Sequence, residues 1–144
     1  MNPRKFLAQL DEAKIVAEIA KAEKGTSGEI RVFVSQREVD EAVSRAQRRF
    51  EKLGMTRTEL RNGVLLYFAP RSRKFAVVGD LGIHEKCGPA FWEEVSTEVR
   101  ERLRTEHFTE AVIRGVRKVG EVLARHFPRQ AGDRDELSNE IARD

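Results

Sequence analysis

The stretch Arg61-Asn-Gly-Val-Leu-Leu-Tyr-Phe-Ala-Pro-Arg-Ser-Arg-Lys-Phe-Ala-Val-Val-Gly-Asp80 decides the fold. Within it, Val64 to Ala69 is an unbroken apolar run, which is typical of a strand that is covered on both faces. Phe75 to Val78 is a second apolar run. The polar segment Pro70 to Arg73 between them predicts a tight hairpin turn.

The centre of that turn sets how the two strands pair. A hairpin centred on residues 71 and 72 pairs Pro70 with Arg73 and Gly63 with Asp80. Upstream, the side chains of residues 29–35 alternate between two faces, with Ile30, Val32 and Val34 on one of them, which predicts a further strand with one buried face. An amphipathic helix over residues 39–53 joins it to the hairpin, so the unit is βαβ and the strands at 29–35 and 63–69 should run parallel.

The remaining apolar patterns predict helices over residues 7–23, from Pro89 onward, and over residues 109–126. The loop at 79–88 is punctuated by glycines and has room for one short helical turn. We expect one α/β domain over residues 1–127, with a mixed sheet and helices on both faces. The tail, residues 128–144, is polar and is predicted to be flexible, with Leu137 and Ile141 as two apolar residues that could dock.

Composition excludes several classes of protein. The 144 residues include 27 Lys and Arg and 24 Asp and Glu, a net charge of +3 that is too small to indicate nucleic-acid binding. The single Cys87 excludes an internal disulfide and indicates a reducing compartment. No apolar run resembles a signal peptide or approaches the roughly 20 residues of a membrane span. We therefore expect a soluble, cytoplasmic protein without membrane insertion.

Polar side chains gather where the two parallel strands begin and the third ends. Carboxylate and amide oxygens there suit a hard cation, Ca²⁺ or Mg²⁺, and the candidate metal ligands are Asp80, Glu85, Asn62 and Glu29. Metal-assisted phosphomonoester hydrolysis would use Asp80, Arg61 and His84 as catalytic candidates. The structural alternative is that Asp80 caps the loop that follows it. No nucleotide-binding motif occurs, so no nucleotide cofactor is expected.

The predicted helix over residues 39–53 carries four basic residues on one face, namely Arg45, Arg48, Arg49 and Lys52. They are candidate contacts for an acidic partner, and the alternative is a solvated helix face. A rival anion-binding position lies at the carboxyl ends of the parallel strands. It offers Ser35-Gln36-Arg37 and the turn arginines Arg71 and Arg73, which are otherwise solvated turn residues.

Several motifs together resemble the short bacterial members of the TPM domain family. They are Thr-Ser-Gly-Glu-Ile-Arg-Val at 26–32, Phe-Glu-Lys-Leu-Gly-Met at 50–55, Arg-Asn-Gly-Val-Leu-Leu-Tyr at 61–67, Arg-Lys-Phe-Ala-Val-Val-Gly-Asp at 73–80 and Phe-Trp at 91–92. The resemblance covers roughly residues 7 to 127 and implies an α/β/α sandwich. The matching functional positions are Asn62-Gly63, Arg73 and the loop from Gly79 to Glu85.

The resemblance also implies two functions. One plant thylakoid-lumen relative is regarded as an acid phosphatase, and some bacterial relatives bind Ca²⁺. Many relatives have an export signal and a membrane anchor, and we find neither pattern here. We therefore expect a soluble module that binds a ligand or partner, with a divalent cation as one ligand and a membrane or envelope protein as the partner. The alternative is a weak metal-assisted acid phosphatase.

Overall fold

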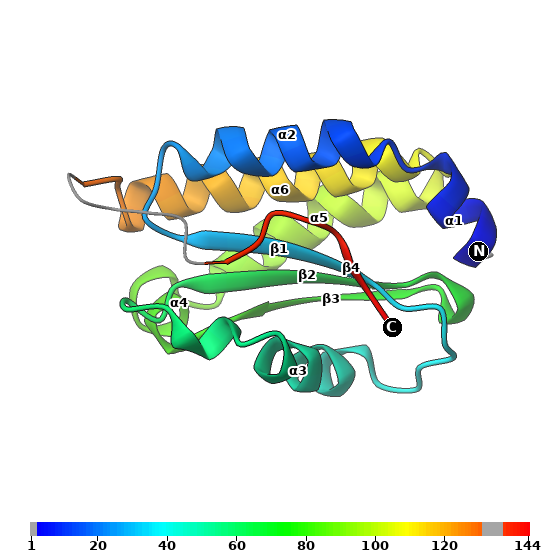
Figure 1. Cartoon of the computed structure of the whole chain (residues 1–144), viewed down its shortest axis with the longest axis horizontal. Helices are drawn as coiled ribbons and strands as arrows, with labels where there is room; N and C mark the ends of the chain where they lie inside the picture. Colours follow the sequence, from blue (N-terminus) through cyan, green and yellow to red (C-terminus); the bar gives the residue numbers. More distant parts are fainter. Residues whose placement is uncertain (1–2, 131–136) are drawn as a thin grey trace.

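The computed structural model describes residues 3–130 and 137–144 of the chain. A four-stranded sheet lies between two layers of helices (Figure 1). Helix α3 (Ala42–Lys52) covers one face of the sheet. The other face is covered by α2 (Glu12–Glu23), α5 (Ala90–Arg104) and α6 (Phe108–His126). The predicted α/β fold with helices on both faces is confirmed.

The sheet has the strand order β3-β2-β1-β4. The strands are β1 (Glu29–Val34), β2 (Gly63–Ala69), β3 (Lys74–Gly79) and β4 (Ala142–Arg143). Strands β1 and β2 are parallel, as the βαβ pattern predicts, and β3 returns antiparallel to β2. A short 3-10 turn, η2 (Pro70–Ser72), closes the hairpin.

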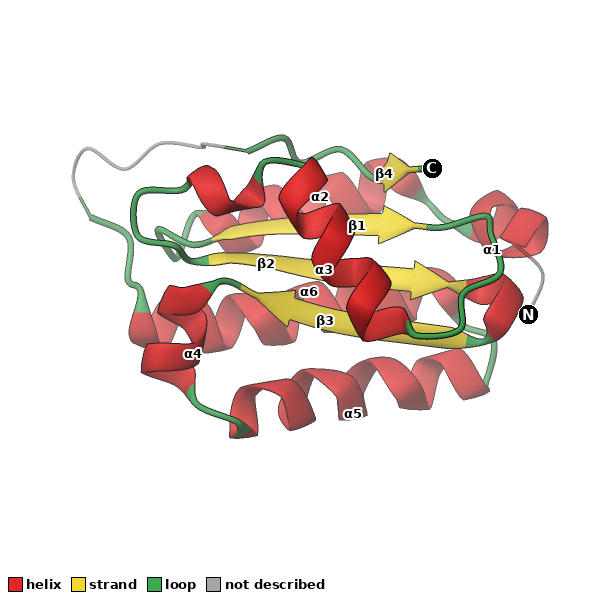
Figure 2. Cartoon of the chain, turned by 90° about the horizontal axis from the view of Figure 1, so that it is seen from below, coloured by secondary structure: helices red, strands yellow, loops and turns green. Residues whose placement is uncertain are grey.

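The register of the hairpin is the one that the turn predicts. Ala69 lies opposite Lys74, Val64 lies opposite Gly79, and the Asp80 N–H donates to the carbonyl of Gly63 at 3.0 Å. The starts of β1 and β2 and the end of β3 therefore meet at one end of the sheet (Figure 2). This end carries the predicted cluster of polar side chains.

Every residue of β2 is buried, because the strand separates two hydrophobic cores. Val64, Leu66 and Phe68 contribute to the larger core under α2, α5 and α6. Leu65 and Tyr67 point the other way, into the smaller core under α3. The unbroken apolar run in the sequence is explained by this burial on both faces.

The first predicted helix, over residues 7–23, is divided into α1 (Pro3–Gln9) and α2. The division falls at Asp11, whose carboxylate accepts a hydrogen bond from the Lys14 N–H at 3.1 Å and so caps α2. Asp11 is therefore the N-cap of α2 and separates it from α1.

The predicted loop at 79–88 contains a helix, α4 (Leu81–Cys87). Asp80 is its N-cap, and Gly82 lets its first turn lie directly on the chain at Leu60 and Arg61. The glycine that indicated a loop in the sequence thus serves close packing.

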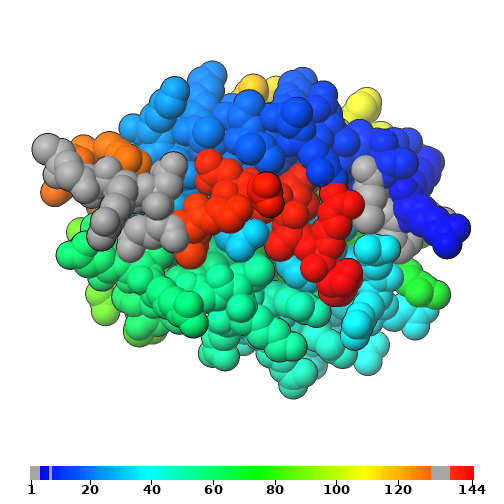
Figure 3. Space-filling model, in the orientation of Figure 1, coloured from blue at the N-terminus to red at the C-terminus, as the bar shows by residue number. Residues whose placement is uncertain are grey.

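The C-terminal segment returns along the sheet. Ala142 and Arg143 pair in parallel with Phe33 and Val34 and form β4, a strand that no pattern in the sequence predicts. Leu137 packs against the smaller core and Ile141 against the larger one, so both predicted contacts form. Figure 3 shows this segment, in red, on the surface between the N-terminal helices and the α3 side. Residues 131–136 of the predicted flexible tail lie outside the described residues.

No helix in the described ranges is both long and apolar enough to cross a lipid bilayer.

Candidate functional site

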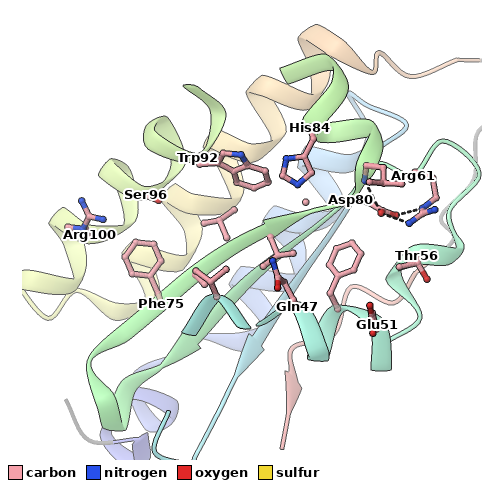
Figure 4. A pocket seen from close by; sticks show the side chains of 17 residues that line it. Gln47, Glu51, Thr56, Arg61, Phe75, Asp80, His84, Trp92, Ser96 and Arg100 are labelled. Atoms are coloured by element: carbon pink, nitrogen blue, oxygen red, sulfur yellow. Dashed lines mark hydrogen bonds and ion pairs between the residues drawn. The ribbon is translucent and has the colours of Figure 1, made fainter. Parts of the chain in front are cut away.

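Arg61 and Asp80 form the centre of the polar cluster at the end of the sheet. Two parallel hydrogen bonds join them, from Nε to Oδ2 at 2.6 Å and from Nη2 to Oδ1 at 2.7 Å (Figure 4). Asp80 is only 5% exposed, and its Oδ1 also accepts from the Leu81 N–H at 2.8 Å. Both carboxylate oxygens are therefore engaged, in pairing Arg61 and in capping α4.

The backbone around Arg61 is shaped to hold this pair. Arg61 has a φ of 52°, a left-handed conformation, and its carbonyl accepts from the Gly82 N–H at 2.9 Å. The hydrogen bond that Arg61 donates to Asp80 is the largest effect on the guanidinium and raises its pKa above the ordinary value for arginine; burial acts in the opposite direction, and the charge of Asp80 adds to the increase. The pair fixes the start of α4 against the start of β2.

The neighbouring Asn62 is buried and is partly satisfied. Its N–H donates to Thr58 Oγ1 at 3.2 Å, and its side-chain amide donates to Ser27 Oγ at 3.3 Å. In the described part of the chain its Oδ1 has no hydrogen-bond partner. A buried amide oxygen of this kind is an available ligand for a hard cation.

The other predicted ligands do not converge on one point. Glu29 is buried at the start of β1, whereas Glu85 is exposed on α4. His84 is also exposed, and its ring lies 5.1 Å from that of Trp92. Within residues 3–130 and 137–144, no group of three or more His, Cys, Asp or Glu side chains could hold a metal ion. A Ca²⁺ or Mg²⁺ site here stays a prediction.

A groove of about 740 Å³ runs from this cluster along the outer edge of β3. Figure 4 shows the arrangement, with α5 side chains Trp92, Ser96 and Arg100 on one side and α3 with Gln47 on the other. Arg61, Asp80 and His84 close one end. Thus the three predicted catalytic residues line one groove, although Asp80 and Arg61 are bound to each other.

The floor of the groove is the open edge of a sheet. Hydrogen-bonded pairs alternate along an antiparallel ladder, and Asp80 bonds to Gly63, so Phe75, Val77 and Gly79 turn their backbone N–H and C=O groups outward. No other strand of the described chain pairs with this edge.

Exposed apolar side chains border this edge. Val43 is 57% exposed and Leu81 is 58% exposed, and both line the groove. With Leu60, they are the exposed large hydrophobic residues among those the structure describes. The helical spacing of Val43 with Val39, Ala46 and Phe50 predicts a buried position for Val43, so this exposed border could not be found from the sequence.

The basic residues of α3 lie at the opposite end of the sheet. Arg45, Arg48, Arg49 and Lys52 line a small cavity of about 60 Å³ together with Ser35, Arg37, Val39, Tyr67 and Asp144. Of the rival anion-binding residues, Arg37 belongs to this cavity. Arg71 is instead 3.7 Å from Glu38, and Arg73 lines a separate pocket beside Phe75. Arg37, Arg71 and Arg73 therefore do not form one site.

The fold and the order of its motifs define the class of protein. Residues 1–122 match the TPM domain. The structure is similar to that of the BA42 protein from the psychrophilic bacterium Bizionia argentinensis, with a TM-score of 0.87, 36% sequence identity and 92% of each chain covered. No functionally curated protein matches the chain.

More distant structures share the fold at 16% identity. The N-terminal domain of a protein from P. gingivalis has a TM-score of 0.62, covering 79% of this chain and 76% of that one. The N-terminal domain of the cg2496 protein from Corynebacterium glutamicum has a TM-score of 0.60, covering 78% and 71%. The chain belongs to the TPM domain family.

Proposed function

We propose that this TPM domain is a partner-binding module that takes an extended peptide segment as an added strand along β3. The observation that supports this most directly is the open β3 edge between the exposed Val43 and Leu81. Main-chain hydrogen bonds along such an edge provide affinity, and apolar contacts on either side select the side chains of the peptide.

Charge indicates which peptides would bind. Arg100 lines both this groove and a second pocket of about 550 Å³, which Arg73 and Arg104 also line. Within the described residues these three arginines form no ion pair, and Arg100 lies over the Phe75 ring at 5.9 Å. A strand added antiparallel to β3 would bring its C-terminal end to these arginines. We therefore expect an apolar segment that ends in acidic residues.

The family resemblance suggests the source of such a segment. We propose that it belongs to a membrane or envelope protein, whose extended flanking regions would reach the domain without the domain itself entering the bilayer.

The test uses a short synthetic peptide of alternating Thr and Val that ends in two Glu residues. NMR of the full chain should show saturable amide shifts at Phe75, Val77 and Gly79. Val43→Glu and Leu81→Glu should each weaken binding at least tenfold, because each places a charge at an apolar contact (about 1.4 kcal/mol or more). Leu60→Glu is the matched control, because Leu60 is similarly exposed but does not line the groove.

Shifts spread over the surface, or equal losses in all three variants, would contradict strand addition. A variant of the peptide with scrambled alternation distinguishes strand pairing from general attraction to arginine, since only the alternating peptide should bind.

A cation site beside the Arg61–Asp80 pair is a second proposal, supported by the buried Oδ1 of Asn62, which has no partner among the described residues. Ca²⁺ or Mg²⁺ would bind there through Asn62 and backbone carbonyls, and Asp80 would join only by leaving Arg61. Titration of the metal-stripped protein should shift the amides of residues 61–63, and Asn62→Ala should abolish those shifts.

The alternative function, metal-assisted phosphatase activity, requires Asp80 to be free of its pair with Arg61. A catalytic Asp80 would have to release Arg61, and turnover of a generic phosphomonoester would then require the cation and would be lost in Asp80→Asn. Cation binding without turnover would leave the domain a binding module.

A further inference from the structure

We propose that the carboxyl end of the parallel strands is an oxyanion-binding site and that Asp144 of the same chain occupies it as an internal competitor. The site is the small cavity lined by Ser35, Arg37, Val39, Arg45, Arg48, Arg49, Lys52, Tyr67 and Asp144. Its ligand would be a phosphate or carboxylate group. It lies at the other end of the sheet from the Arg61–Asp80 pair, so it is independent of the β3 groove.

The position is one that α/β folds commonly use. Ser35 directly follows β1, and its N–H donates to the Phe68 carbonyl of β2 at 2.8 Å. The carboxyl ends of parallel strands leave backbone groups free to meet a ligand. Ser35 is only 1% exposed, so its hydroxyl is held in a fixed place.

The donors at this position already hold a carboxylate. Ser35 Oγ donates to Asp144 Oδ2 at 2.5 Å, and the Gln36 N–H donates to Asp144 Oδ1 at 2.8 Å. The Arg37 N–H donates to Ser35 Oγ at 3.2 Å. Because this bond occupies a lone pair of the hydroxyl, the hydroxyl proton points to the carboxylate. One hydroxyl and one backbone N–H thus each donate a hydrogen bond to a different oxygen of the same carboxylate.

The charges around Asp144 exceed what one carboxylate balances. Five basic side chains line the cavity, and among the described residues Asp144 is the one acidic side chain that lines it. Among the described residues none of the five makes an ion pair, and Arg49 lies over the Phe33 ring at 4.9 Å. This local excess favours an oxyanion of higher charge, such as phosphate, over a single carboxylate.

The segment that carries Asp144 is held by a two-residue strand, by the packing of Leu137 and Ile141 against the two cores, and by a few polar contacts. Strand β4 pairs through two residues, Arg143 pairs with Glu12, and Arg31 donates to the Glu140 carbonyl at 3.2 Å. An external oxyanion that displaces Asp144 has to replace the two hydrogen bonds of its carboxylate, and the adjoining β4 pairs with β1 through two residues only. Occupancy of the donors by an external oxyanion and by the Asp144 carboxylate are therefore mutually exclusive, and loss of the Asp144 contacts loosens the end of β4.

The experiment is a titration of the full chain with inorganic phosphate at constant ionic strength, with chloride as the blank. NMR follows the Gln36 and Arg37 amides for binding and the Ala142 amide for release of β4. We expect Asp144→Asn to tighten the apparent dissociation constant about tenfold, which corresponds to Asp144 occupying the site about nine-tenths of the time. Glu140→Gln is the matched control, because it removes an exposed charge from the same segment.

Two further variants test the residues that line the site. Ser35→Ala should remove saturable binding, and the double variant Arg45→Gln, Arg48→Gln should weaken it without unfolding, since both arginines are exposed. Acetate at the same ionic strength should bind more weakly than phosphate, and equal or tighter binding of acetate would overturn the preference for an oxyanion of higher charge. The proposal is overturned if Asp144→Asn and the wild type bind phosphate equally, if neither binds, or if Glu140→Gln tightens binding as much as Asp144→Asn.

Discussion

The Arg61–Asp80 pair shows how one carboxylate can do two structural tasks. Asp80 neutralises Arg61 and also caps α4, so a single substitution removes both interactions. The sequence predicted the closeness of the two residues and offered capping as the structural alternative. It could not show that Arg61 would take both oxygens of Asp80, because that depends on the left-handed backbone of Arg61.

Two substitutions of Asp80 separate its tasks. Asp80→Asn keeps a good N-cap but removes the charge that pairs Arg61, whereas Asp80→Ala removes both. We expect both variants to be less stable than the wild type, with the alanine variant lower than the asparagine variant by about 1 kcal/mol, the usual value of an N-cap. Urea unfolding measures this difference. Equal stabilities for the two variants would mean that the cap contributes nothing.

Position 82 requires glycine because the backbone of Leu60 and Arg61 leaves no room for a Cβ atom. A Cβ built there would lie 2.5 Å from the Leu60 carbonyl oxygen and 2.7 Å from that of Arg61, and backbone atoms cannot move aside cheaply. We expect Gly82→Ala to destabilise the fold by about 1–3 kcal/mol, although alanine normally favours a helix. Gly25→Ala is the control, since its nearest neighbour would be 3.7 Å away, and its melting temperature should stay close to that of the wild type.

Cys87 should react slowly in the folded protein. Burial is the largest effect on its thiol and raises its pKa, while Arg125 and Lys86 act in the opposite direction. A folded pKa above the unfolded value stabilises the protein below the unfolded pKa, and this contribution is lost as the pH rises through the folded pKa. Labelling with a thiol reagent should therefore be slower than in urea-unfolded protein at the same pH, and the rate for the folded protein should level off at a higher pH than the rate for the unfolded protein. Equal rates for folded and unfolded protein near neutral pH would contradict a shielded thiol.

At the scale of elements, the sequence predicted what periodicity and turns determine. The βαβ unit and the hairpin register follow from the apolar runs and from Pro70, because local chemistry fixes both. Strand β4 could not be predicted, since Ala142-Arg143 has no strand pattern and forms by pairing with a strand far away in the chain. The β3 groove was missed for a related reason: only the tertiary arrangement shows which strand edge stays open.

The division between α1 and α2 gives a prediction for an element boundary. Asp11 caps α2 through the Lys14 N–H, and its own N–H donates to Thr109 Oγ1 at 3.1 Å. Asp11→Ala should cost about 1 kcal/mol, because the side-chain cap is lost while the backbone contact stays. Asp40→Ala is the matched control, as Asp40 is an exposed residue before α3 and caps no helix. Amide exchange in the first turn of α2 should accelerate only in the Asp11 variant.

At the scale of the whole molecule, the two edges of the sheet differ in whether a further strand pairs with them. Strand β4 covers part of the outer edge of β1, whereas no strand of the described chain covers β3. Exposed strand edges invite pairing with other chains, so proteins usually protect them. The protected edge is the one with an internal strand, and the open edge is the one that we propose for a partner.

Removing the C-terminal segment tests this asymmetry. A chain that ends at Gln130 lacks β4 and the contacts of Leu137 and Ile141, so the outer edge of β1 and parts of both cores become exposed. We expect a lower melting temperature and concentration-dependent self-association, measured by light scattering on a size-exclusion column. A full chain carrying Leu137→Ser and Ile141→Ser separates the two effects, because it loses the apolar contacts but keeps the segment that pairs with β1. If the truncated chain stays monomeric with an unchanged melting temperature, then β4 neither protects the edge of β1 nor stabilises the fold. The difference between a protected β1 edge and an open β3 edge would then be contradicted.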